Sequence, residues 1–135
     1  MNLRPSLKEI RKDLSALNRF EVVIYGSYVD KNFTSRSDVD IAVVTREKDR
    51  QENIRIWKDV LKNERPPYQI KVFELLPLHI KADIMDSFIA VFGDKVEISE
   101  HFYYYRRLWK DSMHRYYSNQ FSGFREKIEK LKISG

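Results

Sequence analysis

The stretch VVIYGSYVDKNFTSRSDVDIAVV, residues 22–44, decides both the fold and the candidate site of this chain. Residues 20–25 are β-branched and aromatic, which predicts a buried strand that ends at Gly26. Residues 38–44 predict a second apolar strand, and the turn-forming residues between the two strands predict a short helix or turn followed by a loop. The pattern therefore predicts two strands connected through a glycine–serine turn.

The turn and the second strand carry groups suited to a phosphate and a cation. Gly26 lets a ligand approach the backbone, and Ser27 adds a hydroxyl to the free N–H groups of a helix start. Asp38 and Asp40 are two residues apart on a strand, so both carboxylates leave the same face. Mg²⁺ is usually held by one or two carboxylates together with substrate phosphates. Taken singly, these residues also fit an ordinary turn and the exposed acids of a strand edge.

The rest of the chain alternates helices and strands. Apolar periodicity predicts helices over residues 6–17, 49–63 and 78–86, and further strands over residues 68–75 and 88–92. Strands separated by helices indicate an α/β or α+β sheet domain. We place this domain at residues 1–98 and a helical extension at residues 99–135, within one compact unit.

The segment of residues 99–117 is both aromatic and basic. Large apolar side chains recur there at steps of three and four, which predicts one face of a long helix: Phe102, Tyr105, Trp109, Met113 and Tyr116. We expect this face to pack on the sheet or to form a homodimer with a second subunit. The alternative is that the aromatic and basic residues of the helix bind RNA or DNA.

Composition limits the classes of protein that remain. The chain has 135 residues, 42% of them hydrophobic and 33% charged, which is typical of one folded domain. It has no cysteine, which excludes disulfides and thiolate catalysis. No apolar run is long enough to span a bilayer, and residues 1–14 lack the apolar region of a signal peptide. We therefore expect a cytoplasmic protein without membrane contact.

The formal net charge of +5 is unevenly distributed. Basic residues outnumber acidic ones in residues 1–20 and 99–135, whereas residues 21–98 are mildly acidic. Basic ends around a carboxylate-bearing centre suit an anionic partner such as a nucleotide or a nucleic acid. The same balance is also common in proteins that bind no polymer.

In order and spacing, the residues YGS, ten intervening residues and DVDIAVV resemble the signature of the minimal nucleotidyltransferases of the DNA polymerase β-like superfamily. The resemblance is close over residues 20–44 and looser over residues 45–92. It implies a mixed four-stranded sheet flanked by helices, two Mg²⁺ ions and a nucleoside triphosphate donor, for which ATP is expected. The implied reaction transfers a nucleotidyl group to a protein or nucleic-acid hydroxyl and releases pyrophosphate.

The resemblance also implies roles for individual residues. Asp38 and Asp40 would be catalytic metal ligands, and Gly26 and Ser27 would hold the terminal phosphates. The family usually has a third carboxylate on a later strand, and in residues 68–75 only Glu74 has the apolar neighbours of that pattern. Glu74 would then be the third catalytic metal ligand and would accept the proton of the attacking hydroxyl. Strand alternation puts Lys71 on the face opposite Glu74. If the site faces Lys71, the chain lacks the third acid.

Two other functions remain compatible with the sequence. Minimal members of the family often occur as antitoxin-like subunits that bind, and can modify, a helical partner protein. The chain could instead be a catalytically inactive module that binds nucleic acid. Mg²⁺-dependent nucleotide binding would favour the enzyme. A protein that co-purifies with the chain would favour the interaction subunit. Salt-dependent binding of RNA or DNA without turnover would favour the nucleic-acid-binding module.

Overall fold

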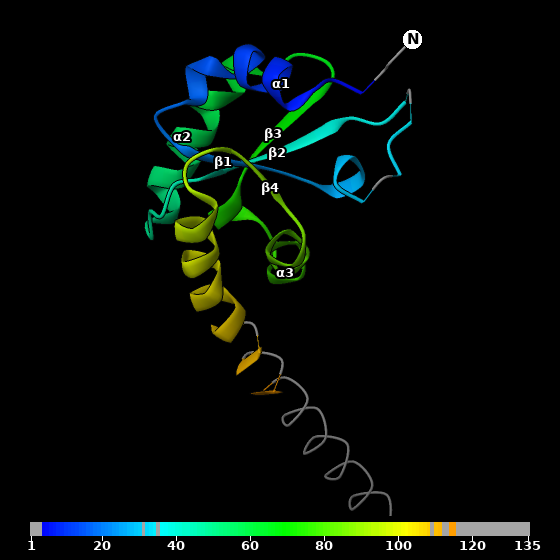
Figure 1. Ribbon diagram of the computed structural model, residues 1–135. Helices are drawn as coiled ribbons and strands as arrows, with labels where there is room; N and C mark the ends of the chain where they lie inside the picture. The colour runs from blue at the N-terminus through cyan, green and yellow to red at the C-terminus, as the bar shows by residue number, and fades with distance from the viewer. Residues whose placement is uncertain (1–3, 31, 35, 109, 112–113, 116–135) are drawn as a thin grey trace, which may run out of the picture.

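The computed structural model describes residues 4–30, 32–34, 36–108, 110, 111, 114 and 115 of the chain. A four-stranded sheet in the order β3–β2–β1–β4 forms its centre (Figure 1). The strands are β1 (Glu21–Tyr25), β2 (Val39–Val44), β3 (Tyr68–Val72) and β4 (Ile89–Phe92). β1 pairs antiparallel with β2 and with β4, whereas β2 and β3 are parallel. The predicted mixed four-stranded sheet is therefore confirmed.

The helices that flank the sheet also lie where the sequence predicts them. They are α1 (Leu7–Asp13), α2 (Arg50–Val60) and α3 (Leu78–Asp86). α1 and α2 each continue into a short 3-10 helix, η1 (Ser15–Leu17) and η3 (Leu61–Asn63). Another 3-10 helix, η2 (Gly26–Tyr28), follows β1 directly and forms the expected glycine–serine turn. None of the helices in the described part of the chain has the length and apolar character needed to cross a membrane.

The two faces of the sheet bury separate apolar clusters. On one face, α1 and α2 cover fully buried residues of β1 and β2 that include Val22, Ile24 and Ile41. On the other face, α3 covers Val23 and Ala42 together with residues that follow β4. Neighbouring residues of a strand point to opposite faces of the sheet, and helices cover both faces of β1 and β2. Most residues of these strands are therefore buried, which explains their continuous apolar runs.

One strand is shorter than predicted. β3 ends at Val72, and residues Phe73–Leu75 form the 3-10 helix η4 instead of continuing the strand to residue 75. Phe73 is completely buried there, with its ring centroid 4.7 Å from that of Phe102. The alternation of faces expected along residues 68–75 therefore stops before Glu74.

The helix after β4 spans residues 95–108, so it begins before the predicted boundary at residues 98 and 99. Phe102 of this helix is 2% exposed and packs between Phe73 and Phe88, and Tyr105 lies edge-on to Phe73. The first part of the predicted aromatic face thus packs on the sheet domain. The rest of that face, Trp109, Met113 and Tyr116, lies outside the described residues.

Candidate active site

The two aspartates lie together at the start of β2. Asp38 directly precedes the strand and is exposed, and Asp40 is half-buried within it. Asp40 pairs with Tyr25 at the end of β1, so the carboxylate lies beside the turn that follows β1. Gln69 on β3 donates a hydrogen bond of 2.8 Å from Nε2 to Asp38 Oδ2. The buried side chain of Val39 faces away from the aspartates and anchors this end of the strand in the core.

Gly26 adjoins the Asp40 carboxylate so closely that a side chain at this position would displace it. Its φ angle is +75°, and a Cβ atom added to it would collide with Asp40 Oδ2. The turn is closed by hydrogen bonds from the backbone N–H groups of Val29 and Asp30 to the Gly26 carbonyl, at 3.0 and 3.1 Å. Ser27 is half-buried within the same turn. The structure therefore brings Gly26, Ser27 and both aspartates to one end of the sheet.

The local electrostatics disfavour negative charge at Asp40. Burial raises the pKa of this carboxyl group most, the neighbouring Asp38 raises it further, and Lys71 partly opposes both effects. Tyr25 is affected as well, since burial and the charge of Asp40 raise the pKa of its phenol to about 12. A cation bound between the aspartates would relieve this concentration of negative charge.

The donors present fit a divalent cation that shares its coordination with a substrate. Two carboxylates converge beside a glycine whose bare backbone leaves room for phosphate oxygens. Among the residues that the structure describes, no three His, Cys, Asp or Glu side chains are arranged to hold a metal. A divalent cation here would take two carboxylates from the protein and its remaining oxygen donors from water and a ligand such as a triphosphate.

A cavity of about 480 Å³ opens beside the turn. It is lined by Tyr25, Gly26 and Asp30, and from α3 and the residue that follows it by Ile80, Asp83, Asp86 and Ser87. Its size is in the usual range for small-molecule sites. Because its charged lining is acidic, an anionic ligand requires accompanying cations. The sequence pattern did not point to the α3 residues, because only the tertiary fold brings them to the turn.

Glu74 lies at the other end of β2. Its carboxylate accepts hydrogen bonds from the backbone N–H groups of Thr45 and Arg46, at 3.0 and 2.9 Å, directly after the strand ends. Thr45 follows Asp40 by five residues, which is about 16 Å along a strand. The structure therefore does not bring Glu74 to the two aspartates, because the chain turns into η4 and directs this side chain elsewhere.

The buried Glu74 side chain is a hydrogen-bond acceptor for the segment that follows β2. Burial alone would raise its pKa, but nearby His101 and the Thr45 and Arg46 amides lower it, and the pKa lies below its ordinary value. The His101 Nε2 atom lies 3.8 Å from Glu74 Oε2, which is an ion-pair distance and too long for a hydrogen bond. These contacts fix the chain where it leaves β2.

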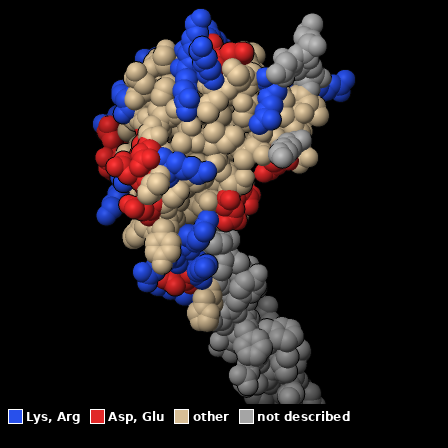
Figure 2. Space-filling view, in the orientation of Figure 1, with Lys and Arg blue, Asp and Glu red and all other residues tan. Residues whose placement is uncertain are grey.

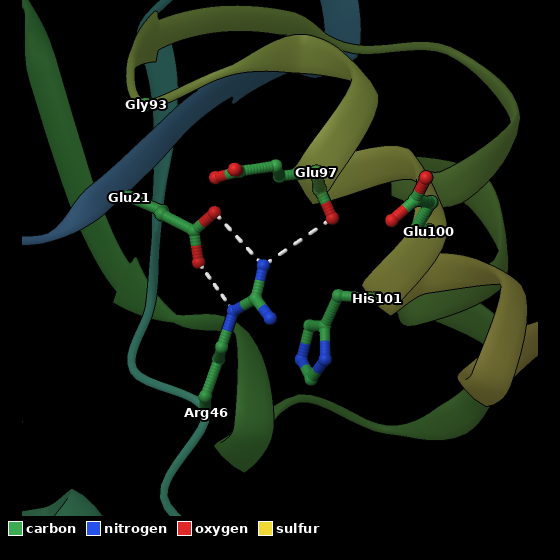
Figure 3. A pocket seen from close by; sticks show the side chains of 6 residues that line it. All are labelled: Glu21, Arg46, Gly93, Glu97, Glu100 and His101. Atoms are coloured by element: carbon green, nitrogen blue, oxygen red, sulfur yellow. Dashed lines mark hydrogen bonds and ion pairs between the residues drawn. The ribbon is translucent and has the colours of Figure 1, made fainter.

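Arg46 reinforces this end of the sheet (Figure 3). Its guanidinium donates to both carboxylate oxygens of Glu21, at 2.6 and 3.0 Å, and to the backbone carbonyl of Glu97, at 3.3 Å. These bonds connect the end of β2 to β1 and to the helix of residues 95–108. A cavity of about 720 Å³ lined by these side chains, Gly93, Glu100 and His101 lies here, away from the aspartates.

On β3, the residues beside the aspartates are not acids. Asp40 is in register with Gln69, and Ala42 with Lys71, so these two β3 side chains lie on the face that carries Asp40. Lys71 is close enough for its charge to lower the pKa of Asp40. The strand that could have supplied a third carboxylate supplies an amide and an ammonium group.

Sequence comparison places the chain in a class that agrees with this fold and site. Residues 7–91 match the family model of the nucleotidyltransferase domain. A protein of Methanocaldococcus jannaschii described as a "putative protein adenylyltransferase" is 39% identical over 109 residues, which cover 81% of this chain and 84% of that protein. The chain belongs to the nucleotidyltransferase domain family, as the signature in residues 22–44 indicated.

Solved structures share the fold. A chain from the crystal structure of a toxin–antitoxin with AMP-PNP has a TM-score of 0.54 at 14% identity, over 87% of this chain and 97% of that one. A chain from the complex of a tri-AMPylated Shewanella oneidensis HEPN toxin with an MNT antitoxin has a TM-score of 0.56 at 12% identity, over 83% and 90% of the two chains. At such low identities the similarity shows a common fold.

Proposed function

We propose that this nucleotidyltransferase binds a nucleoside triphosphate with Mg²⁺ at Gly26, Ser27, Asp38 and Asp40 and transfers the nucleoside monophosphate to a protein hydroxyl. The close approach of the Gly26 backbone to the Asp40 carboxylate carries the proposal, because it joins a place for phosphate to a place for a cation. The description of the Methanocaldococcus relative as a protein adenylyltransferase supports both ATP as the donor and a protein as the acceptor. The toxin–antitoxin neighbour with AMP-PNP also supports ATP.

In this mechanism the chain's own residues hold and orient the donor. The backbone of the turn and the Ser27 hydroxyl bind the terminal phosphates, and the aspartates hold the cation. When bound, Mg²⁺ neutralises charge on the triphosphate and on the departing pyrophosphate.

The acceptor hydroxyl oxygen forms a bond to the α-phosphorus. At the same time, the bond breaks between the α-phosphorus and the oxygen that bridges it to the β-phosphate. The electron pair of the broken bond leaves with pyrophosphate. Asp38, the exposed member of the pair, is the carboxylate open to the approaching acceptor, and it takes the hydroxyl proton.

The face of the molecule seen in Figure 2 and the helix of residues 95–108 favour a protein acceptor over a nucleic acid. In Figure 2, Lys and Arg side chains lie among Asp and Glu side chains across the visible face. Nucleic-acid sites instead tend to show a basic patch on one face. The helix of residues 95–108 exposes Tyr103, Tyr104 and Leu108, which are side chains typical of protein interfaces. This exposed face also fits an antitoxin-like subunit that modifies its bound partner.

The experiment compares ATP labelled at the α-phosphate with ATP labelled at the γ-phosphate, each incubated with Mg²⁺, the protein and cell extract. We expect only the α-labelled donor to label a product, and we expect that product to be degraded by protease and not by nuclease. With Asp40→Asn in place of the wild type, we expect no transfer of label. Transfer of the γ label would show a kinase instead. Label in a nuclease-sensitive product would replace the protein acceptor with a nucleic acid.

A further inference from the structure

Lys71 lies on β3, on the face of the sheet that carries Asp40, two residues after Gln69, which is the register partner of Asp40. β3 runs parallel to β2 at the edge of the sheet, and its residues Gln69 and Lys71 share the face of Asp40. The Glu74 carboxylate is held at the far end of β2 by the Thr45 and Arg46 amides. On this face β3 therefore offers an amide and a cation to the aspartates, and no acid.

The surroundings of Lys71 hold its ammonium group at this edge. Lys71 Nζ lies 5.5 Å from the centre of the Trp57 ring, within the range of a cation–π contact. The ring itself is fixed, because the Trp57 indole N–H donates a 3.0 Å hydrogen bond to the Ile70 carbonyl. Lys71 also acts on the charge of Asp40, whose pKa it lowers. The ammonium group thus lies against an aromatic ring, on a side chain that leaves the face of the sheet carrying Asp40.

The carboxylates at this site are too few for two metal ions. A two-metal site needs carboxylates that bridge the ions and further ligands for each of them. Here one oxygen of Asp38 already accepts a hydrogen bond from Gln69. No third acid joins the pair among the residues that the structure describes. A second divalent cation would also meet the repulsion of the Lys71 ammonium.

We infer that Lys71 takes the place of a second divalent cation, so that this chain binds its nucleotide with one metal ion instead of two. The inference rests on the proposed function, since it concerns the same donor site. In the complex, the Lys71 ammonium supplies a fixed positive charge beside Asp40. This arrangement departs from the two Mg²⁺ ions that the family resemblance implies.

The test counts metal ions in the complex with a donor that cannot react. The full chain is saturated with the α,β-methylene analogue of ATP, and bound Mn²⁺ is counted by electron paramagnetic resonance. We expect one Mn²⁺ for each bound nucleotide in the wild type and two in Lys71→Asp, which restores a carboxylate at this position. Circular dichroism establishes that the variant is folded.

Each outcome has a distinct meaning. Two Mn²⁺ ions in the wild type would overturn the inference and leave the proposed function intact, and this result needs no variant. A folded Lys71→Asp that still binds one Mn²⁺ would also overturn the role given to Lys71. If the wild type bound no Mn²⁺ in the presence of the nucleotide, the proposed donor site would be refuted. The same would hold if Asp40→Asn bound Mn²⁺ and nucleotide as the wild type does.

Discussion

The Asp40 carboxylate is held in an environment that disfavours its charge. It is half-buried, lies beside Asp38, and has a raised pKa for which burial is the largest cause. Functional sites often carry such a cost, because groups placed to bind a ligand are not placed to stabilise the free protein. Two consequences can be measured, one for stability and one for ligand binding.

Asp40→Asn is expected to raise the free energy of unfolding at pH 7. Because the folded state raises the pKa of Asp40 above its ordinary value of 3.8, the folded state holds this proton more tightly than the unfolded state. The wild type therefore loses stability as the pH rises from that value through the raised pKa. Urea unfolding should show the gain of the variant at pH 7 and its disappearance below the ordinary pKa. A variant that is less stable at pH 7 would show that Asp40 has a structural role.

Gly26→Ala is expected to reduce both stability and nucleotide affinity. An alanine at a φ of +75° costs about 1–3 kcal/mol, and its Cβ would displace the Asp40 carboxylate. Gly93→Ala is the matched control, because Gly93 also has a positive φ, of +100°, but a Cβ added there would meet Glu21 at the other end of β1. Calorimetry should show weaker binding of the ATP analogue only for Gly26→Ala. Equal affinities for the two variants would exclude a role for this turn in binding phosphate.

Glu74→Gln is expected to lower the free energy of unfolding by about 1–3 kcal/mol, because the Thr45 and Arg46 amides lose a charged acceptor. The pKa of Glu74 is lowered in the folded state, so its contribution is present above its ordinary pKa of 4.5. That contribution is lost as the pH falls through the lowered value. Chemical unfolding at a series of pH values should show the two proteins converging in acid. A stability difference independent of pH would mean that the charge of Glu74 is not what stabilises the segment.

The strands show where the apolar pattern of the sequence predicts an element correctly and where it does not. β1 and β2 were predictable because both are continuous apolar runs, and the glycine–serine turn lies between them in the sequence. The end of β3 was not predictable, because residues 73–75 keep an apolar–acid–apolar pattern that a strand also shows. Burial of Phe73 against Phe102, which lies far away in the sequence, decides that η4 forms there.

The helix of residues 95–108 packs on the sheet domain through Phe102. Phe102→Ala should lower the free energy of unfolding by about 3–5 kcal/mol, because the side chain is enclosed by Phe73 and Phe88. Tyr103→Ala is the control on the same helix, since Tyr103 is 62% exposed, and it should change stability by less than about 0.5 kcal/mol. Thermal unfolding measures both. A Phe102→Ala protein that melts like the wild type would show that this helix does not depend on the sheet.

Across the whole molecule, the two ends of β1 and β2 have different roles. The end near Asp40 gathers the glycine turn and two carboxylates, whereas the end near Glu74 is held together by hydrogen bonds and the Arg46–Glu21 ion pair. The first group could be predicted because its members lie within one short stretch of sequence. The positions of Glu74, Lys71 and the α3 acids could not, because strand register and helix packing determine them.

The central claim is that the donor nucleotide binds where β2 begins. Isothermal titration calorimetry of the α,β-methylene analogue of ATP with Mg²⁺ tests this claim most directly, because it needs no acceptor. Asp40→Asn and Glu74→Gln are compared with the wild type under conditions in which all three are folded. We expect binding to be lost, or weakened by at least about tenfold, in Asp40→Asn and to be retained in Glu74→Gln. Loss of binding in Glu74→Gln with retention in Asp40→Asn would contradict the account.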